Sequence, residues 1–241
     1  MMAVLDAESF VRPRHAPGAF ESLRQQVVAS IGPGVGVAVT NVDGDPLQLW
    51  PVEQTAIRHA IPRRQREFSA GRTAAREAMA QVGSHPSAIP VRSDRSPTWP
   101  GGVVGSIAHT RRACVAVAGR QEQVHALGID LEEDVSMDPD LWETICTPEE
   151  ALVLATLPAS ERGRWVTRLF CAKEAFYKWQ YPQTGRMLEF RDVQVTLSPT
   201  RTTFGVQTAR QTESPVLVSR REGGCISHQG MVFAWVIGAP A

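Results

Sequence analysis

Helix-forming and strand-forming segments alternate along the whole of this 241-residue chain, without an internal period that would indicate a repeat architecture. Pro62 and Pro148 suit first helical positions, and Thr147 with Glu150 forms the pattern of a capping box. The expected helices cover residues 62–81, 148–157 and a segment from 161 or 164 to 179, which Tyr181-Pro182 ends. The first expected strand follows a turn at 32–34 and ends near residue 40. The other expected strands cover 113–118, 124–132, 193–197, 216–218 and 231–237. This pattern predicts an α+β fold.

The strands at 113–118 and 124–132 are separated by a short turn, so we expect them to pair as an antiparallel hairpin centred near Gln121. In that register residue 130 lies opposite residue 112, and residue 132 lies opposite residue 110. His109 is then expected beside the acidic end of the partner strand.

Composition excludes several classes of protein. The formal net charge is zero, which gives no overall argument for binding nucleic acid or membranes. No stretch reaches the roughly 18 continuous apolar residues of a membrane span, and residues 1–6 lack the features of a secretory signal. The four cysteines are widely spaced without a CxxC pair, so we expect free thiols and a cytoplasmic location.

Two carboxylates alternate with apolar residues in the segment Gly-Ile-Asp-Leu-Glu at 128–132. On a strand, Asp130 and Glu132 project from the same face, while Ile129 and Leu131 point to the core. Their repulsion would weaken a sheet unless a cation lay between them, and oxygen ligands select a hard ion such as Mg²⁺. The alternative is an exposed acidic strand end that continues into 133–134.

The chain's two lysines, against 23 arginines, both fall in the segment Lys-Glu-Ala-Phe-Tyr-Lys at 173–178. Because a lysine amine is a compact donor whose pKa is tuned by burial, this bias marks the segment as a candidate for chemistry. On a helix Glu174 and Lys178 face the same way and supply a third carboxylate and a cation. The same spacing also suits an ordinary surface ion pair.

The expected helix at 62–81 carries five arginines, and Gly71 in its middle suggests close approach by another part of the molecule. The arginines are Arg63, Arg64, Arg66, Arg72 and Arg76. A solvated basic face is the simpler interpretation, and a phosphate-binding helix is the functional one. Three carboxylates, two lysines, a histidine and this helix together form an inventory for phosphoryl transfer.

Four segments in this order resemble the 4′-phosphopantetheinyl transferases, and more closely their monomeric, two-lobed surfactin and enterobactin type. They are Arg-x-x-Glu-Phe-x-x-Gly-Arg at 64–72, Gly-Ser-Ile-Ala-His at 105–109, Gly-Ile-Asp-Leu-Glu at 128–132 and Cys-Ala-Lys-Glu-Ala-Phe-Tyr-Lys at 171–178. The similarity covers roughly residues 55–195. It implies two pseudo-symmetric halves, residues 1–125 and 126–241, each with helices packed on a small, mainly antiparallel sheet.

The resemblance also implies a reaction and its residues. Coenzyme A would be split at its pyrophosphate, the phosphopantetheine arm would pass to a serine of an acyl or peptidyl carrier protein, and 3′,5′-ADP would leave. The implied Mg²⁺ ligands are Asp130, Glu132 and Glu174, with Glu174 also helping to deprotonate the serine and Lys178 stabilising charge on the pyrophosphate. The implied coenzyme A contacts are Arg64, Arg72, Arg95, Ser106, His109 and Lys173.

The chain departs from the family pattern at two of these segments, and two other functions compete. Ala108 stands where the family often has Ser or Thr, and Cys171 where Ser is common. The competing functions are a non-catalytic coenzyme A or nucleotide-binding protein and a metal-dependent nucleotide hydrolase. A carrier-docking surface would separate them, and the candidates are Leu141, Trp142 and Ile145, for which core packing is the simpler interpretation. The carriers could belong to fatty acid, polyketide or nonribosomal peptide pathways, and the resemblance implies a monomer.

Overall fold

The computed structural model describes residues 20–209 and 220–238. Its α-helices are α1 (Glu21–Ile31), α2 (Pro51–Ile57), α3 (Pro62–Gln81), α4 (Trp142–Ile145), α5 (Pro148–Thr156) and α6 (Ala159–Thr184). Short 3₁₀ turns are η1 (Pro46–Gln48), η2 (Pro139–Leu141) and η3 (Phe190–Asp192). The strands are β1 (Val35–Thr40), β2 (Val103–His109), β3 (Cys114–Arg120), β4 (Ala126–Glu133), β5 (Val193–Leu197), β6 (Thr203–Thr208), β7 (Arg221–His228) and β8 (Met231–Gly238). The α+β class is confirmed.

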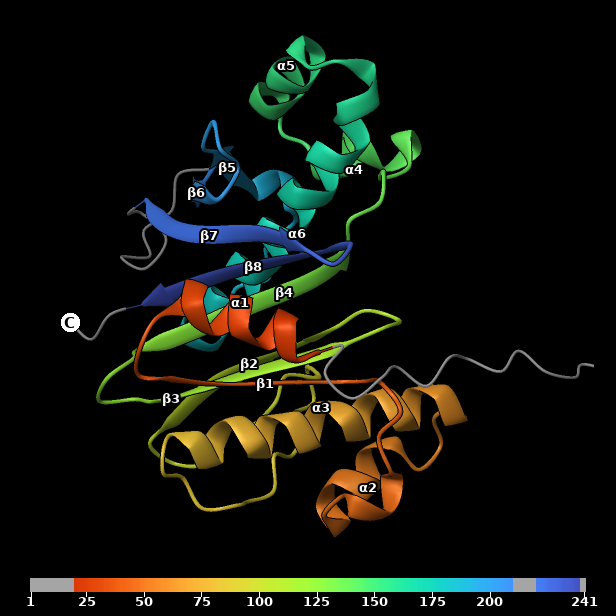
Figure 1. Cartoon of the computed structure of the whole chain (residues 1–241), viewed down its shortest axis with the longest axis vertical. Coiled ribbons are helices and arrows are strands. Elements are labelled where there is room, and N and C mark those ends of the chain that lie inside the picture. The colour runs from red at the N-terminus through yellow and green to blue at the C-terminus, as the bar shows by residue number, and fades with distance from the viewer. Residues whose placement is uncertain (1–19, 210–219, 239–241) are drawn as a thin grey trace, which may run out of the picture.

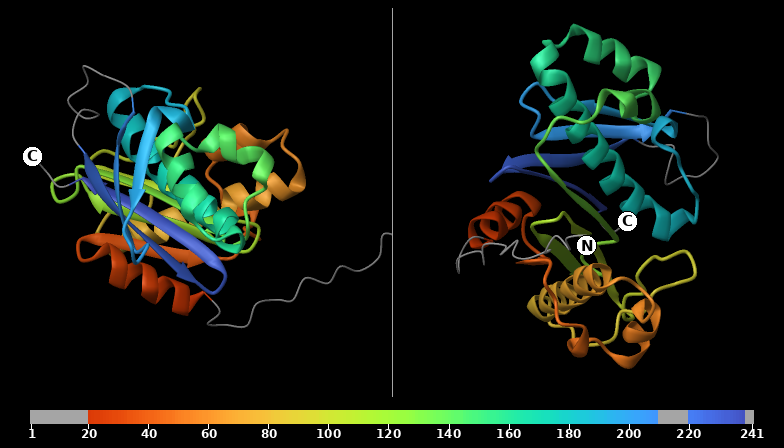
Figure 2. Two further views of the ribbon diagram at one scale, coloured as in Figure 1. Left: turned by 90° about the horizontal axis from the view of Figure 1, so that it is seen from above. Right: turned by 90° about the vertical axis from the view of Figure 1, so that its right-hand side faces the viewer.

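The strands form two antiparallel sheets, each with one long helix against it. The smaller sheet has the order β1-β3-β2, and the larger has the order β4-β8-β7-β6-β5. Helix α3 packs on the smaller sheet and α6 on the larger, so the two helices lie on opposite outer sides of the sheets (Figure 1). Helix α1 contacts β1 and β7 and therefore touches both sheets (Figure 2).

Strand β3 is buried on both faces because its side chains alternate between two different cores. Ala116 and Ala118 pack with alanines of α3, and these small side chains let the helix lie close to the sheet. Val115 and Val117 point the other way, into a core that contains Ile129 of β4 together with residues of α1 and β8. This second core joins the two sheets.

Glycines mark the places where each long helix approaches its sheet most closely. A Cβ at Gly128 of β4 would lie 2.1 Å from the backbone oxygen of Ala175, so only glycine fits beneath α6. A Cβ at Gly71 of α3 would lie 3.2 Å from Cγ2 of Ile107 in β2, which confirms the close approach expected there. The Gly128 contact brings α6 directly over the strand that carries Asp130.

Two sequence predictions about secondary structure are wrong. Strands β3 and β4 do not form a hairpin: β3 pairs with β1 and β2, while Asp130 of β4 lies opposite Ala234 of β8. Both β3 and β4 pair with an apolar strand elsewhere in the chain, and that pairing buries their surfaces better than a local hairpin would. Helix α6 also continues through Pro182 and ends only at Gly185, which takes the left-handed conformation at φ 64°.

Several other expectations are confirmed. Helix α3 has the predicted bounds, and the capping box at Thr147 and Glu150 begins α5. The strands β1, β5 and β8 lie where the sequence placed them, whereas the expected strand at 216–218 lies outside the described residues. All four cysteines are buried free thiols. Among the described helices, none has the length and apolar character that crossing a membrane requires.

Candidate active site

The centre of the candidate site is a contact between strand β4 and helix α6. The ammonium nitrogen of Lys178 donates a hydrogen bond of 2.6 Å to Oδ1 of Asp130, a side chain that is 7% exposed. Oδ2 of Asp130 is also buried, and it has no hydrogen-bond partner among the described residues. Neighbouring Ile129 and Leu131 are fully buried, as the alternation of the strand predicts. Asp130 is thus a half-satisfied buried carboxylate, and such a group requires a further partner.

The charges around Asp130 influence one another. Burial, followed by the nearby charge of Asp130, raises the pKa of Glu132 to about 7. Burial likewise raises the pKa of Glu174, with Lys178 opposing the shift and Asp130 adding to it. Burial acts to lower the pKa of Lys178, but its contacts with Asp130 and the charge of Glu174 outweigh that effect and raise it. Three carboxylates and one ammonium therefore share a single electrostatic site.

The residues present fit a divalent cation. The donor set of Asp130, Glu132 and Glu174 contains only carboxylate oxygens, which hard ions prefer. The partnerless Oδ2 of Asp130 and the raised pKa of Glu132 are both signs of negative charge that lacks a counter-ion. The described residues contain no group of three His, Cys, Asp or Glu side chains already arranged to hold a metal. Mg²⁺ is commonly held by one or two carboxylates, with waters and phosphate oxygens as its other ligands.

His109, at the end of β2, contacts the arginine helix. Nη1 of Arg64 donates to Nε2 of His109 over 3.1 Å. Because arginine is always a donor, this Nε2 accepts, and neutral His109 carries its proton on Nδ1. Burial is the largest cause of the lowered pKa of His109, with Glu67 opposing the shift and Arg64 adding to it. The pair therefore joins α3 to the end of β2 with His109 in its neutral form.

Arg72 lies deeper than Arg64 and is only 6% exposed. Its Nε donates to the carbonyl oxygen of Ile89 over 2.8 Å, and its guanidinium stacks 4.1 Å from the ring centroid of Phe68. Burial lowers its pKa to about 10. The interpretation of α3 as a simple solvated basic face is therefore wrong for Arg72.

Ser106 and Lys173 have structural partners that the sequence did not predict. The buried Ser106 accepts a hydrogen bond of 3.1 Å from the backbone nitrogen of Ile129, which links β2 to β4. The ammonium of Lys173 is 1% exposed and donates to Glu150 and to the carbonyl oxygens of Ile145 and Phe190. These three acceptors use all three of its donors. In this arrangement no donor of Lys173 is left for the expected contact with a coenzyme A phosphate, and that contact stays a prediction.

An open groove of about 770 Å³ runs beside Glu174, between helix α6 and the segment 187–193. Its lining includes Tyr177, Met187 and Phe190 together with the acidic side chains Glu143 and Glu174. The buried Lys173 anchors two of its walls, because Ile145 ends α4 and Phe190 begins η3. The sequence did not indicate this groove, since its walls come from separate segments.

Arg95 lies on a loop that reaches towards α6. Arg95 has a φ of 70°, which is uncommon for a residue with a side chain. The adjacent Asp94 accepts hydrogen bonds from Ser96 and from the hydroxyl of Tyr181 on α6, the latter over 3.0 Å. Sequence reasoning missed Tyr181, because nothing local relates it to residue 94.

The other sequence candidates lie on or near the core. Of the three possible docking residues, Leu141 is 48% exposed, Ile145 is buried, and Trp142 is partly buried with its indole nitrogen bonded to the Met137 carbonyl. Ala108 and Cys171 are both buried, so the missing hydroxyls at these positions face the core.

Comparison with known proteins places this architecture among its relatives. The family described as 4′-phosphopantetheinyl transferase N-terminal domain matches residues 52–119, and the 4′-phosphopantetheinyl transferase superfamily matches residues 126–227. The chain is 34% identical to 4′-phosphopantetheinyl transferase Svp of Streptomyces mobaraensis, over 85% of each chain. It is 36% identical to 4′-phosphopantetheinyl transferase PptT of Mycobacterium tuberculosis, over 70% of this chain and 77% of the relative. Enterobactin synthase component D of Escherichia coli K12 is 34% identical over 56% of this chain and 64% of its own.

Proposed function

The chain belongs to the 4′-phosphopantetheinyl transferase superfamily and transfers phosphopantetheine from coenzyme A to carrier proteins, and we propose which of its residues carry this reaction. The observation that supports the assignment best is the half-satisfied carboxylate of Asp130. It is hydrogen-bonded to Lys178, and its charge raises the pKa of both Glu132 and Glu174. A site of this kind suits a pyrophosphate substrate held through a cation.

Asp130, Glu132 and Glu174 are the proposed ligands of Mg²⁺. When bound, the ion would neutralise negative charge on the pyrophosphate oxygens of coenzyme A. Carboxylate oxygens from β4 and α6 would hold it, which explains why the close approach of α6 at Gly128 matters for the site.

Glu174 is the proposed general base for the carrier serine. Burial raises the pKa of Glu174, which makes it a stronger base than an exposed glutamate. The serine hydroxyl loses its proton to Glu174, directly or through a water, and its oxygen forms a bond to the phosphorus that carries the pantetheine arm. The bond from that phosphorus to the bridging oxygen breaks, and 3′,5′-ADP leaves.

The cationic residues have separate proposed roles in binding coenzyme A and balancing its charge. Lys178 balances charge on the pyrophosphate, because its side chain is 30% exposed and its ammonium is a rotatable donor that can turn from Asp130 to the substrate. Arg64 and His109 hold the nucleotide phosphates at the end of β2, where they already contact each other. Arg72 and Arg95 would bind the 3′-phosphate region. Ser106 would act through its bond to Ile129, and Lys173 through the groove walls, rather than by touching substrate.

The two sheets are the proposed halves of one cleft, divided at residues 125 and 126. Each carries a long helix, and their shared core supports the proposal that the chain works as a monomer. The four buried thiols support a reducing compartment, which we propose is the cytoplasm.

Intact-mass spectrometry tests the reaction directly. Apo carrier domains from fatty acid, polyketide and nonribosomal peptide systems are each incubated with the protein and coenzyme A, with and without Mg²⁺. A gain of one phosphopantetheine that requires the metal supports the assignment, and the series of carriers identifies the pathway. Coenzyme A binding without transfer would instead support a non-catalytic protein, and release of products without a carrier would support a hydrolase.

A further inference from the structure

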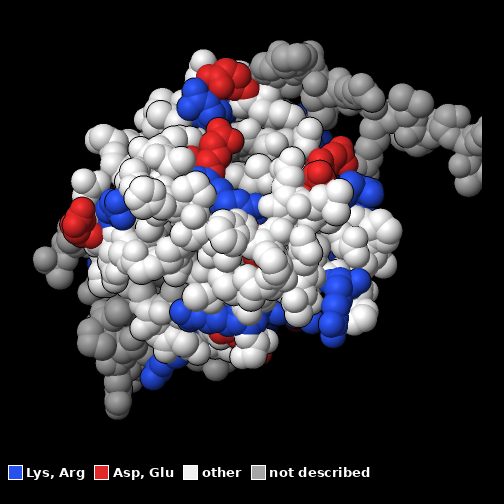
Figure 3. Space-filling view, turned by 90° about the horizontal axis from the view of Figure 1, so that it is seen from below, with Lys and Arg blue, Asp and Glu red and all other residues white. Residues whose placement is uncertain are grey.

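The five arginines of α3 differ in how their charge is balanced. Arg63 lies 2.7 Å from Glu67, Arg66 lies 3.6 Å from Asp43, and Arg76 lies 3.0 Å from Glu53. Arg64 is 3.9 Å from Glu67. On the side of the molecule that carries α2 and α3, basic and acidic side chains are correspondingly interspersed (Figure 3). Within the described part of the chain, Arg72 alone among these five has no carboxylate within 4.0 Å.

The surroundings of Arg72 fix its orientation. Its Nε is held by the Ile89 carbonyl, and one face of its guanidinium is covered by Phe68. The two terminal nitrogens have no hydrogen bond to described residues, and neither is among the fully buried atoms without a partner, so this end reaches solvent. A fixed guanidinium with two free terminal donors presents a fork that matches the oxygens of a phosphate.

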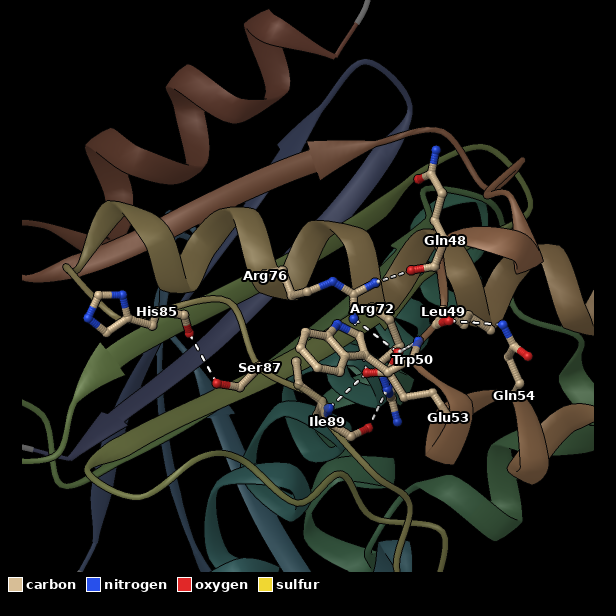
Figure 4. A network of polar contacts seen from close by, with 10 residues as sticks. All are labelled: Gln48, Leu49, Trp50, Glu53, Gln54, Arg72, Arg76, His85, Ser87 and Ile89. Carbon is tan, nitrogen blue, oxygen red and sulfur yellow. Dashed lines mark hydrogen bonds and ion pairs between the residues drawn. The ribbon is translucent and has the colours of Figure 1, made fainter.

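The residue that holds Arg72 through its carbonyl oxygen is itself held through its backbone nitrogen. Oε1 of Glu53, a residue with no exposed surface, accepts from the backbone nitrogen of Ile89 over 2.8 Å. Oε2 of Glu53 accepts from the backbone nitrogen of Trp50 over 2.9 Å, at the start of α2. Nη1 of Arg76 lies 3.0 Å from both carboxylate oxygens. Figure 4 shows Glu53 at the centre of these contacts, with Ile89 between it and Arg72.

We infer that Glu53 is a positioning residue for Arg72, and that the chain of contacts from Glu53 through Ile89 to Arg72 sets selectivity for the 3′-phosphate of coenzyme A. Glu53 holds the backbone nitrogen of Ile89, the carbonyl oxygen of the same residue holds Nε of Arg72, and the orientation of Nε determines where the terminal donors point. Arg76 contributes by neutralising Glu53 and is thereby withdrawn from ligand binding. This inference rests on the proposed role of Arg72 in binding the 3′-phosphate.

The test compares coenzyme A with 3′-dephospho-coenzyme A as substrates for the same apo carrier protein. The variants are Arg72→Met, Glu53→Gln and Glu150→Gln, and kcat/KM is measured per folded protein with each substrate. Glu150 is a matched control, since it is also a buried capping-box glutamate that accepts from a distant backbone nitrogen, that of Val195, and from a buried cation, Lys173. It lies in the C-terminal half, against the other long helix.

Arg72→Met is expected to lower kcat/KM for coenzyme A by about 10- to 100-fold and to change the value for 3′-dephospho-coenzyme A by less than about twofold. Glu53→Gln is expected to show the same selective loss at about five- to tenfold. Glu150→Gln is expected to leave the ratio of the two kcat/KM values unchanged, because a loss of stability lowers kcat/KM for both substrates alike.

The outcomes separate the inference from the assignment on which it rests. In one outcome Arg72→Met loses selectivity, but Glu53→Gln, like Glu150→Gln, lowers kcat/KM for both substrates in the same proportion. The positioning role of Glu53 is then wrong, and the role of Arg72 stands. If Arg72→Met leaves the ratio unchanged, the role of Arg72 fails and the inference fails with it. Should Glu53→Gln not fold, Glu53→Asp keeps the charge beside Arg76 but shortens the reach to Ile89, and the same selective loss is expected.

Discussion

Lys178 and Asp130 meet through only one of the two carboxylate oxygens: the ammonium nitrogen lies 2.6 Å from Oδ1, and the buried Oδ2 has no partner among the described residues. An ion pair that served stability alone would satisfy both oxygens, because a buried polar atom without a partner is costly. The arrangement instead leaves one oxygen without a partner, as expected of a carboxylate that also binds a cation.

Mg²⁺ is therefore expected to stabilise the folded protein through Asp130. A ligand that binds only the folded state stabilises it by RT ln(1 + [L]/Kd), so the melting temperature rises with the ligand concentration. The melting temperature of the wild-type protein should rise as MgCl₂ is added at constant ionic strength, and Asp130→Asn should abolish the rise. Glu133→Gln, on the same strand but outside the proposed ligand set, is the control and should respond like the wild type. An equal rise in all three proteins would show that the ion binds elsewhere.

Glu174→Gln is expected to lower the transfer rate by at least about 100-fold, as for the loss of a general base. Because burial raises the pKa of Glu174, a neutral amide suits the site, and the free energy of unfolding in urea should not fall. The rate is measured from the mass of the carrier protein over time. Turnover at the wild-type rate would rule out Glu174 as both base and ligand.

Lys178→Arg tests whether the amine itself is required. The variant keeps the positive charge but replaces a compact, rotatable donor with a planar fork. We expect kcat to fall by about tenfold or more, the scale of one misplaced charge-assisted hydrogen bond. Lys178→Met, which removes the charge, should lower kcat further. Unchanged kinetics in the arginine variant would show that charge alone is sufficient.

Lys173→Met is expected to reduce the free energy of unfolding by about 3–5 kcal/mol, because it leaves Glu150 buried without its cation. The double variant Lys173→Met with Glu150→Gln should recover part of this loss, since no buried charge remains. Urea unfolding measures both. The folded fraction of Lys173→Met should keep the wild-type KM for coenzyme A. A large rise in KM would instead support the contact with a coenzyme A phosphate that the sequence suggested.

The lowered pKa of His109 predicts a dependence of stability on pH. Its folded-state pKa lies below the ordinary value of 6.5, so the unfolded chain takes up the proton first as the pH falls. The free energy of unfolding should therefore decrease as pH falls below about 6.5, and this contribution should level off once the folded state is also protonated. His109→Gln keeps an acceptor for Arg64 and should show a smaller decrease between pH 7 and 5. The same slope in both proteins would assign the effect to other groups.

Local signals in the sequence predicted the helix starts well. First-turn prolines and the capping box act within four residues, and the structure places α3 and α5 where these signals indicate. Pro182 misled the prediction because its missing N–H affects only the last turn, and the helix continues for two further residues, ending beside a left-handed glycine.

Long-range pairing could not be predicted in the same way. Local sequence favoured a hairpin between β3 and β4, but both strands are largely buried and pair with other strands. Those neighbours, β1 and β8, lie far away in the sequence. The partners of Lys173 could not be predicted for the same reason: Ile145, Glu150 and Phe190 are separated along the chain, and only the fold brings them around one ammonium.

The shared core beneath α1 has a consequence for how the chain acquires its structure during synthesis. Ser22 of α1 and His228 of β7 lie 2.8 Å apart in space, although 206 positions separate them along the chain. Helix α1 is thus translated well before its partner strand β7. Until then its apolar face, with Leu23 and Val27, lacks part of its native cover. We therefore expect this core to close only after β7 has been synthesised, with the apolar face of α1 available to chaperones in the interval.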